Sequence, residues 1–266
     1  MPAIHALESA PIRGIAVDQS ARWLREGWAD FMRRPLVSLS SGLVFAAAGY
    51  LLVVVFAEEG LTALILPAAG GFILVGPFAA LILYEVSRRD HSGLPVTASA
   101  VVGTLAERLP AIANLGLVFL MLFLLWMVTA MGLFALFFAT GTLPPLDEMA
   151  VYALFAPENI AFLATGTAVG AVFAAVAFAI GVVSVPAVLD RGIGAAEAVA
   201  LSLRTVRANW RGMIGWAATI AVVVAAGLAL AFAGLAVALP VTAFASWHAY
   251  RDLIGQKAET SGGTAA

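Results

Sequence analysis

Residues 212–250 read GMIGWAATIAVVVAAGLALAFAGLAVALPVTAFASWHAY and contain no aspartate, glutamate, lysine or arginine. A single helix of this length would extend about 58 Å, roughly twice the thickness of the hydrocarbon core of a bilayer. The run therefore predicts two shorter helices that fold back near residues 227–234, with Pro240 in the second helix.

Four other runs without formal charge reach the length of about 20 residues that a membrane helix needs: residues 36–57, 61–84, 110–139 and 160–189. The chain is thus predicted to be an all-α polytopic membrane protein. Its six transmembrane helices are expected at about residues 36–57, 61–86, 110–139, 160–189, 212–230 and 233–250. They form one membrane domain, residues 18–255, between a cytoplasmic N-terminal segment (1–17) and a disordered C-terminal tail (256–266).

The composition supports this class. Of 266 residues, 62% are hydrophobic and only 11% are charged, whereas about a quarter of a soluble domain is charged. The absence of cysteine excludes disulfides, zinc–thiolate sites and iron–sulfur clusters. A net charge of -2, with Glu26 and Asp30 among the arginines of the N-terminal region, argues against binding to nucleic acid.

Charge also predicts the orientation. With six spans, all 14 lysines and arginines fall on one side, which the positive-inside rule makes the cytoplasmic side. The charged residues of the outer connections are all acidic: Glu58, Glu59, Asp147, Glu148 and Glu158. Asp147, Glu148 and Glu158 could gather a divalent cation, but their wide spacing favours solvated loop charges. Both termini should therefore be cytoplasmic, in a bacterial inner membrane.

Three inner segments, residues 22–34, 96–109 and 193–211, have apolar residues at helical spacing opposite charged ones. We expect amphipathic helices on the membrane surface, with tryptophans and arginines at headgroup depth. The residues proposed to contact anionic lipid or a protein partner are Trp23, Trp28, Arg33, Arg34, Arg88, Arg89, Asp190, Arg191, Arg204, Arg207, Arg211, Trp247 and Arg251.

The chain can be interpreted as three copies of one unit, an interfacial helix followed by two spans. Pro77 is followed seven and eleven residues later by Tyr84 and Arg88, and Pro240 by Trp247 and Arg251. In the fourth span the spacing differs, because Pro186 is followed by Asp190 and Arg191. Internal triplication and coincidence both remain open.

The stretch Gly71-Phe-Ile-Leu-Val-Gly-Pro77, continuing through Tyr84-Glu-Val-Ser-Arg-Arg89, resembles a bacterial family of predicted integral membrane proteins, domain of unknown function 2189. Further matching blocks, over nearly the whole chain, are Trp23–Trp28 with Pro35, Val183–Arg191 with Ala208–Trp210, and Leu239–Arg251. The resemblance implies six spans and a bacterial inner membrane, and it implies no catalytic residue.

We expect no catalytic, metal-binding or ion-transporting side chains within the membrane spans. No ionisable residue lies near the middle of a span, which disfavours ion-coupled transport. His5, His91 and His248 are far apart and lack metal-ligand spacing, so we expect no metal and no cofactor, with His248 packed in an aromatic belt. No catalytic motif is present, so we do not expect an enzyme.

Other residues at the ends of the spans have structural interpretations. Glu85 should form an ion pair with Arg88 and Arg89, and Asp190 with Arg191 should join the fourth span to the third interfacial helix. Small or helix-breaking residues are candidates for close packing or for hinges: Pro77, Gly166, Gly170, Pro186 and Pro240.

These patterns favour an accessory or scaffolding protein of the inner membrane that binds lipid headgroups or a partner membrane complex, as a single chain or a homo-oligomer. The alternative is a transporter or lipid-handling protein for an apolar or zwitterionic molecule. In that case the three prolines would act as hinges, and small residues such as Gly76 and Gly166 would line a cavity.

Overall fold

The computed structural model describes residues 12, 14, 18–61, 65, 68, 76–138, 156–230 and 232–254. Over these residues the chain is all-helical, with nine helices and no strand. The helices are α2 (Gln19–Arg33), α3 (Pro35–Glu58), α5 (Leu81–His91), α6 (Ala98–Phe138), η2 (Pro157–Asn159), α8 (Ile160–Arg191), α9 (Ala195–Ala208), α10 (Trp210–Ala229) and α11 (Leu235–Ile254).

Four helices of the described part are long and apolar enough to cross a membrane: α3, α6, α8 and α10. They match four of the six predicted spans. Most of the predicted span 61–86 lies outside the described residues, although residues 76–79 and α5 are helical. The sixth predicted span corresponds to α11, which is a helix but is not among these four.

The charge-free run 212–250 does fold back as predicted. Helix α10 ends at Ala229 and α11 begins at Leu235. Phe232 has a φ of 67°, and a Cβ on Gly234 would lie 2.7 Å from the Cα of Gly227. The turn therefore depends on small residues that let the two helix ends approach closely.

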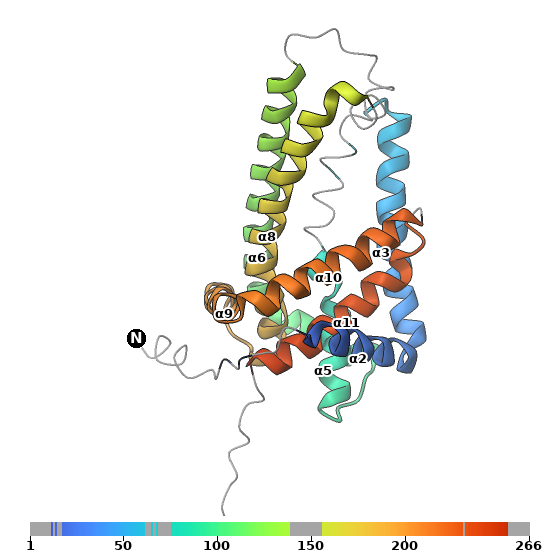
Figure 1. Ribbon diagram of the computed structural model, residues 1–266. Coiled ribbons are helices and arrows are strands. Elements are labelled where there is room, and N and C mark those ends of the chain that lie inside the picture. Colours follow the sequence, from blue (N-terminus) through green and yellow to red (C-terminus); the bar gives the residue numbers. More distant parts are fainter. Residues whose placement is uncertain are drawn as a thin grey trace, which may run out of the picture.

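Helices α3, α6 and α8 extend in one direction, while α2, α5, α9 and α11 gather at one end (Figure 1). The first turn of α3, the first turn of α6 and the last turn of α8 all lie at that end. Arg34 directly precedes α3 and Arg191 is the last residue of α8, so these two arginines lie at that end.

Helix α11 lies at the centre of this end and packs against α2, α3, α5, α8 and α10. Most of its side chains are buried, including Phe244, Trp247 and Leu253. A helix buried on all sides needs neighbours whose backbones can come close. Two glycines provide this, because Gly27 of α2 and Gly42 of α3 both face the backbone of α11.

Two of the three predicted interfacial segments correspond to helices of the structure, and one does not form a separate helix. Residues 22–34 correspond to α2 and residues 193–211 to α9 with the start of α10. The prediction of a separate helix over 96–109 was wrong, because α6 continues through Pro110 to Phe138. Proline removes one backbone hydrogen bond, and the helix-forming alanines and leucines on both sides of Pro110 allow the helix to continue.

Replacing Gly27 with alanine should destabilise the protein, although alanine usually favours a helix. The added Cβ would lie 2.6 Å from the carbonyl oxygen of Val241 and 2.7 Å from the amide nitrogen of Ala245, both backbone atoms. We expect a loss of about 1–3 kcal/mol, seen as a lower thermal midpoint by circular dichroism in detergent micelles.

Gly103→Ala is the matched control, since Gly103 also lies within a helix but a Cβ there meets nothing within 4 Å. This variant should melt at or slightly above the wild-type temperature. Equal midpoints for the two variants would show that the contact between α2 and α11 is not tightly packed.

Candidate functional site: a polar cluster where three helices meet

A polar cluster lies where α2, α5 and α11 meet. On α2, Trp23, Gly27 and Asp30 are buried at successive turns and face α11. The same helical spacing that buries Trp23 and Gly27 therefore carries a carboxylate into the protein, where only 6% of Asp30 is exposed. A buried carboxylate must find partners, and Asp30 has three.

The partners of Asp30 come from all three helices. The Nε2 atom of His248 on α11 lies 3.0 Å from Oδ2, and the Ser87 hydroxyl of α5 donates to the same oxygen at 3.3 Å. The guanidinium of Arg33 donates to Oδ1 at 2.6 Å. Burial alone would raise the pKa of Asp30, but the hydrogen bond with His248 and the charges of His248, His91 and Arg33 outweigh burial and lower that pKa.

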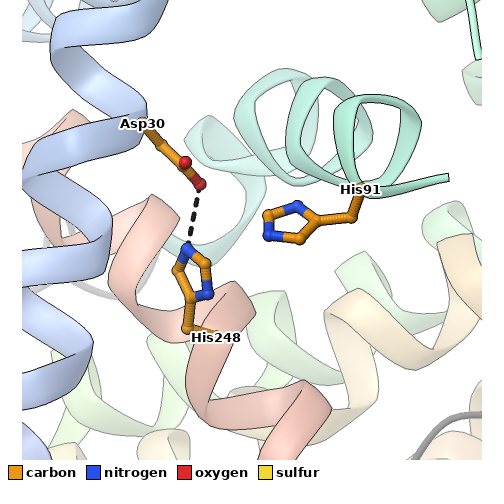
Figure 2. Close-up of side chains that lie close together, drawn as sticks. All are labelled: Asp30, His91 and His248. Carbon is orange, nitrogen blue, oxygen red and sulfur yellow. Dashed lines mark hydrogen bonds and ion pairs between the residues drawn. The ribbon is translucent and has the colours of Figure 1, made fainter. Parts of the chain in front are cut away.

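His91 at the end of α5 completes the cluster (Figure 2). Its Nδ1 lies 2.8 Å from the carbonyl oxygen of Ser87, and its ring centroid lies 5.0 Å from that of His248. Loss of hydration lowers the pKa of His91, and the positive charge of Arg251 lowers it further. One ligand atom from each of Asp30, His91 and His248 lies within 4.8 Å of the others.

Sequence reasoning missed this cluster. We expected the histidines to be separate and His248 to pack in an aromatic belt, with no set of metal-binding side chains. Three helices that are distant in sequence supply the three groups, so no local spacing could have revealed them. The one available signal was Asp30 itself, a carboxylate on the face of the first amphipathic segment that also carries Trp23 and Gly27.

The predicted ion pair of Glu85 is confirmed. Glu85 is fully buried, and Arg88 donates to it with two nitrogens at 2.6 and 2.8 Å, while Arg89 donates at 2.6 Å. Arg89 also donates to Thr104 of α6 at 2.9 Å and to the carbonyl of Ala100 at 2.8 Å. Glu85 therefore holds two arginines in place, and one of these joins α5 to α6.

Asp190 and Arg191 at the end of α8 contact α11, which we did not predict. Tyr250 of α11 donates to Asp190 at 2.8 Å, and Arg191 donates to the Tyr250 oxygen at 3.3 Å and to the carbonyl of Ile254 at 3.4 Å. These bonds link α8 to α11, a contact that we did not predict. The reason is that α11 returns to the same end of the protein and packs against α8 there.

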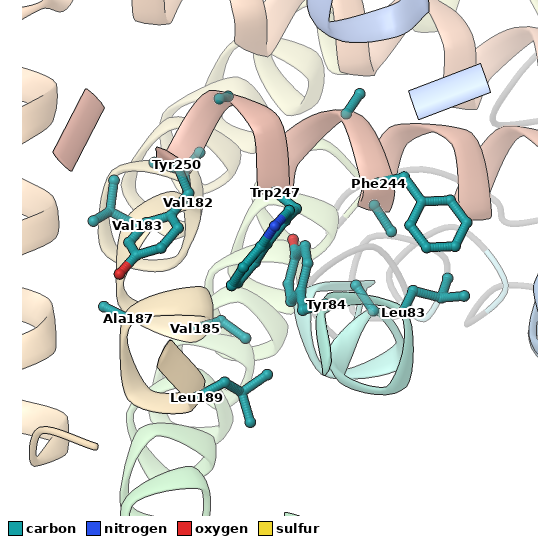
Figure 3. Packing of buried hydrophobic residues seen from close by; sticks show 14 of the residues in the cluster. Leu83, Tyr84, Val182, Val183, Val185, Ala187, Leu189, Phe244, Trp247 and Tyr250 are labelled. Carbon is teal, nitrogen blue, oxygen red and sulfur yellow. The ribbon is translucent and has the colours of Figure 1, made fainter. Parts of the chain in front are cut away.

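Two tryptophans expected at headgroup depth are inside the protein. Trp23 is fully buried, donates to Asp252 at 2.7 Å and meets Trp216 edge to face with centroids 5.4 Å apart. Trp247 is 2% exposed and lies beside Tyr84 (Figure 3). Their assignment to lipid was wrong, because the amphipathic face of α2 packs against α11 rather than pointing outward.

The remaining charged candidates lie nearer the surface. Arg34 donates to Asp90 at 2.6 and 3.1 Å, and Arg251 is half-buried near His91. Among the described residues, no carboxylate lies within ion-pair distance of Arg204, Arg207 or Arg211, and the latter two are exposed.

The proposed packing and hinge residues divide into three groups. Among the described residues, a Cβ on Gly166 would meet nothing within 4 Å, and one on Gly170 would meet only Trp126, so this pair does not bring two described helix backbones together. Pro186 and Pro240 are buried within continuous helices. Pro77 is half-buried in the helical stretch 76–79.

Residues 65–190 match the model of a family described as predicted integral membrane protein (DUF2189). This segment belongs to the DUF2189 family. The expected resemblance is therefore confirmed for the segment that contains α5, α6 and α8. Comparisons with curated proteins and with solved structures give no match.

The DUF2189 segment contains His91 and Glu85, whereas Asp30 and His248 lie outside it. The polar cluster thus joins this segment to the helices before and after it in the chain. The sequence blocks at residues 23–35 and 239–251, which we also likened to the family, fall outside the matched range.

Glu85→Ala in the DUF2189 segment should destabilise the protein strongly. The substitution leaves Arg88 and Arg89, whose side chains are only 19% and 13% exposed, without their carboxylate. Removing one partner of a buried ion pair costs about 3–5 kcal/mol, which thermal unfolding in detergent would report. Glu107→Ala, at an exposed position of α6, should leave the midpoint unchanged, and a similar midpoint for both variants would contradict the structural role of Glu85.

Proposed function

We propose that the chain is an accessory or scaffolding protein of a bacterial inner membrane, anchored by its long helices and binding anionic lipid headgroups at its arginine-rich end. The observation that carries the proposal is the surface of α2 and α3, where large apolar side chains point outward. Trp28 is 49% exposed, Met32 57% and Leu36 84%. No catalysed reaction is part of the proposal.

The long helices support the membrane assignment. Helix α6 has 41 residues and would extend about 60 Å, twice the hydrocarbon thickness, so its first turns project beyond the membrane. Its exposed side chains are apolar over most of the remainder: Leu117, Leu120, Met121, Leu124, Leu125, Val128, Met131 and Leu136. Such a surface is stable when it faces lipid.

The arrangement of the helices supports an even number of crossings. Helix α3 runs away from the arginine-rich end, and α5 lies at that end again. This arrangement is consistent with the second span that the sequence predicts. Helix α8 returns in the same way after α6. Both termini are then on the arginine-rich side, which we propose is the cytoplasm.

We propose that α10 and α11 form a hairpin that enters the bilayer from the cytoplasm and returns without crossing. A Cβ on Gly42 would meet Ala236 at the start of α11, so the turn lies beside Gly42. Gly42 is seven residues into α3, about 10 Å along its axis. The six predicted spans then become four crossings and one re-entrant hairpin.

Two surfaces at the arginine-rich end fit headgroups. On α2, Trp28, Met32 and the following Leu36 lie next to the exposed Arg25 and Arg33. At the junction of α9 and α10, Leu203 and Trp210 are exposed with Arg207 and Arg211, and the Arg211 guanidinium lies 5.0 Å from the Trp210 ring centroid. Tryptophan and arginine together are typical of the bilayer interface.

Spin labels on single cysteines would test the α2 surface, and the native chain contains no cysteine to remove. In lipid discs, a label at Trp28→Cys should collide with oxygen, which partitions into the bilayer, more than with a water-soluble nickel chelate. Ala29→Cys, the adjacent exposed position on the arginine face, should show the reverse. Equal preference for the aqueous reagent at both positions would contradict insertion of α2.

Extraction in native lipid discs, followed by mass spectrometry of co-purifying lipids and proteins, would test the α9–α10 surface. We expect enrichment of anionic lipid that falls several-fold in the variant with Arg204, Arg207 and Arg211 all changed to alanine. A stoichiometric protein lost from the same variant would instead identify a partner complex. One enriched apolar or zwitterionic molecule, independent of these arginines, would favour the transport alternative.

A further inference from the structure

We propose that Asp30, His91 and His248 bind one divalent transition-metal ion of the zinc class. The site is independent of the headgroup-binding surfaces, because its ligands lie between helices rather than on the outward faces of α2 and α9. Two imidazoles and one carboxylate are a donor set that zinc and ferrous iron both accept, with remaining coordination positions open to water or another ligand.

The hydrogen bonds of the two histidines support metal binding. In metal sites, the ring nitrogen that does not bind the metal usually donates to a carbonyl or a carboxylate. Nδ1 of His91 lies 2.8 Å from the Ser87 carbonyl oxygen, which can only accept, so Nδ1 carries the proton and Nε2 keeps its lone pair. Nδ1 of His248 lies 3.3 Å from Glu26, so its Nε2 likewise faces the cluster.

The carboxylate of Asp30 is oriented in a similar way. Arg33 donates to Oδ1 at 2.6 Å, while Oδ2 accepts from the Ser87 hydroxyl at 3.3 Å and lies 3.0 Å from Nε2 of His248. Each of the three candidate ligands thus has one atom held by a neighbour and another atom directed into the cluster. Such supporting hydrogen bonds orient ligands before the metal arrives.

The distances need only a small adjustment. Ligand atoms around a tetrahedral zinc ion are roughly 3.3 Å apart, given bonds of about 2.0–2.1 Å to nitrogen and oxygen. Asp30 Oδ2 and His248 Nε2 are 3.0 Å apart, and the widest separation in the set is within 4.8 Å. A movement of about 1.5 Å by the exposed His91 ring would bring the set to ligand spacing.

The charge of the cluster and its accessibility to solvent also suit the binding of a cation. Asp30 and Glu26 bring two carboxylates to the cluster, and Arg33 and Arg251 offset part of that charge without occupying the ligand atoms that face inward. Asp30 is buried while His91 is exposed, so an ion can enter from the side of His91 and keep water as a further ligand.

The test is zinc binding by the full chain, purified in detergent without a polyhistidine tag and stripped with a chelator. We expect one zinc ion per chain by calorimetry, and visible absorption bands typical of nitrogen and oxygen coordination when cobalt is used instead. His91→Ala and His248→Ala should each weaken zinc binding by about 100-fold, and Glu26→Gln, which removes a supporting carboxylate, by about tenfold. His5→Ala is the matched control and should bind like the wild type.

Thermal unfolding separates a metal site from a purely structural cluster. Zinc should raise the midpoint of the wild type and of His5→Ala by several degrees, and it should not raise that of His91→Ala. Because His91 is exposed, metal-free His91→Ala should melt close to the metal-free wild type, which shows that the variant is folded. Absence of saturable binding, or unchanged affinity in both histidine variants, would overturn the proposal and leave an ion-pair cluster of His248 with Asp30 and Glu26.

Discussion

The burial of α11 among five other helices is the constraint on which the rest of the structure depends. A helix surrounded on all sides needs close contact with its neighbours, and Gly27 and Gly42 provide this for α2 and α3. Its bulky residues Phe244, Trp247 and Tyr250 then fill the space toward α5 and α8 (Figure 3). The long helices α3 and α8 are thereby joined at one end through the last of the described helices.

Packing α11 at this end also brings charged groups into the protein. His248, Tyr250 and Asp252 lie on a helix that is apolar in its first half, and each finds a partner on a neighbouring helix: Asp30 and Trp23 on α2, and Asp190 on α8. A buried polar group without a partner destabilises the folded state. These three polar contacts therefore follow from the position of α11, and so does the proposed metal site.

Much of the helical architecture could be predicted from the sequence, while the site could not. The boundaries of α3 and α8 and the turn between α10 and α11 agree with the charge-free runs, since each such run is governed by local hydropathy and length. The ion pair of Glu85 with Arg88 and Arg89 was also predictable, because the residues are three and four positions apart on one helix. Trp23 was misassigned to lipid, since an amphipathic face looks the same whether it meets a bilayer or another helix.

By itself the sequence determined that the protein is helical and that its helices suit a membrane, because composition and periodicity act locally along the chain. The placement of the arginines toward one side stays a prediction from the order of the spans. Only the tertiary structure decided that α2 packs on α11 and that α11 contacts α8 through Tyr250. It alone brought Asp30, His91 and His248 within 4.8 Å of one another. Contacts between residues more than fifty positions apart depend on which helix faces pack together, and no spacing in the sequence records that choice.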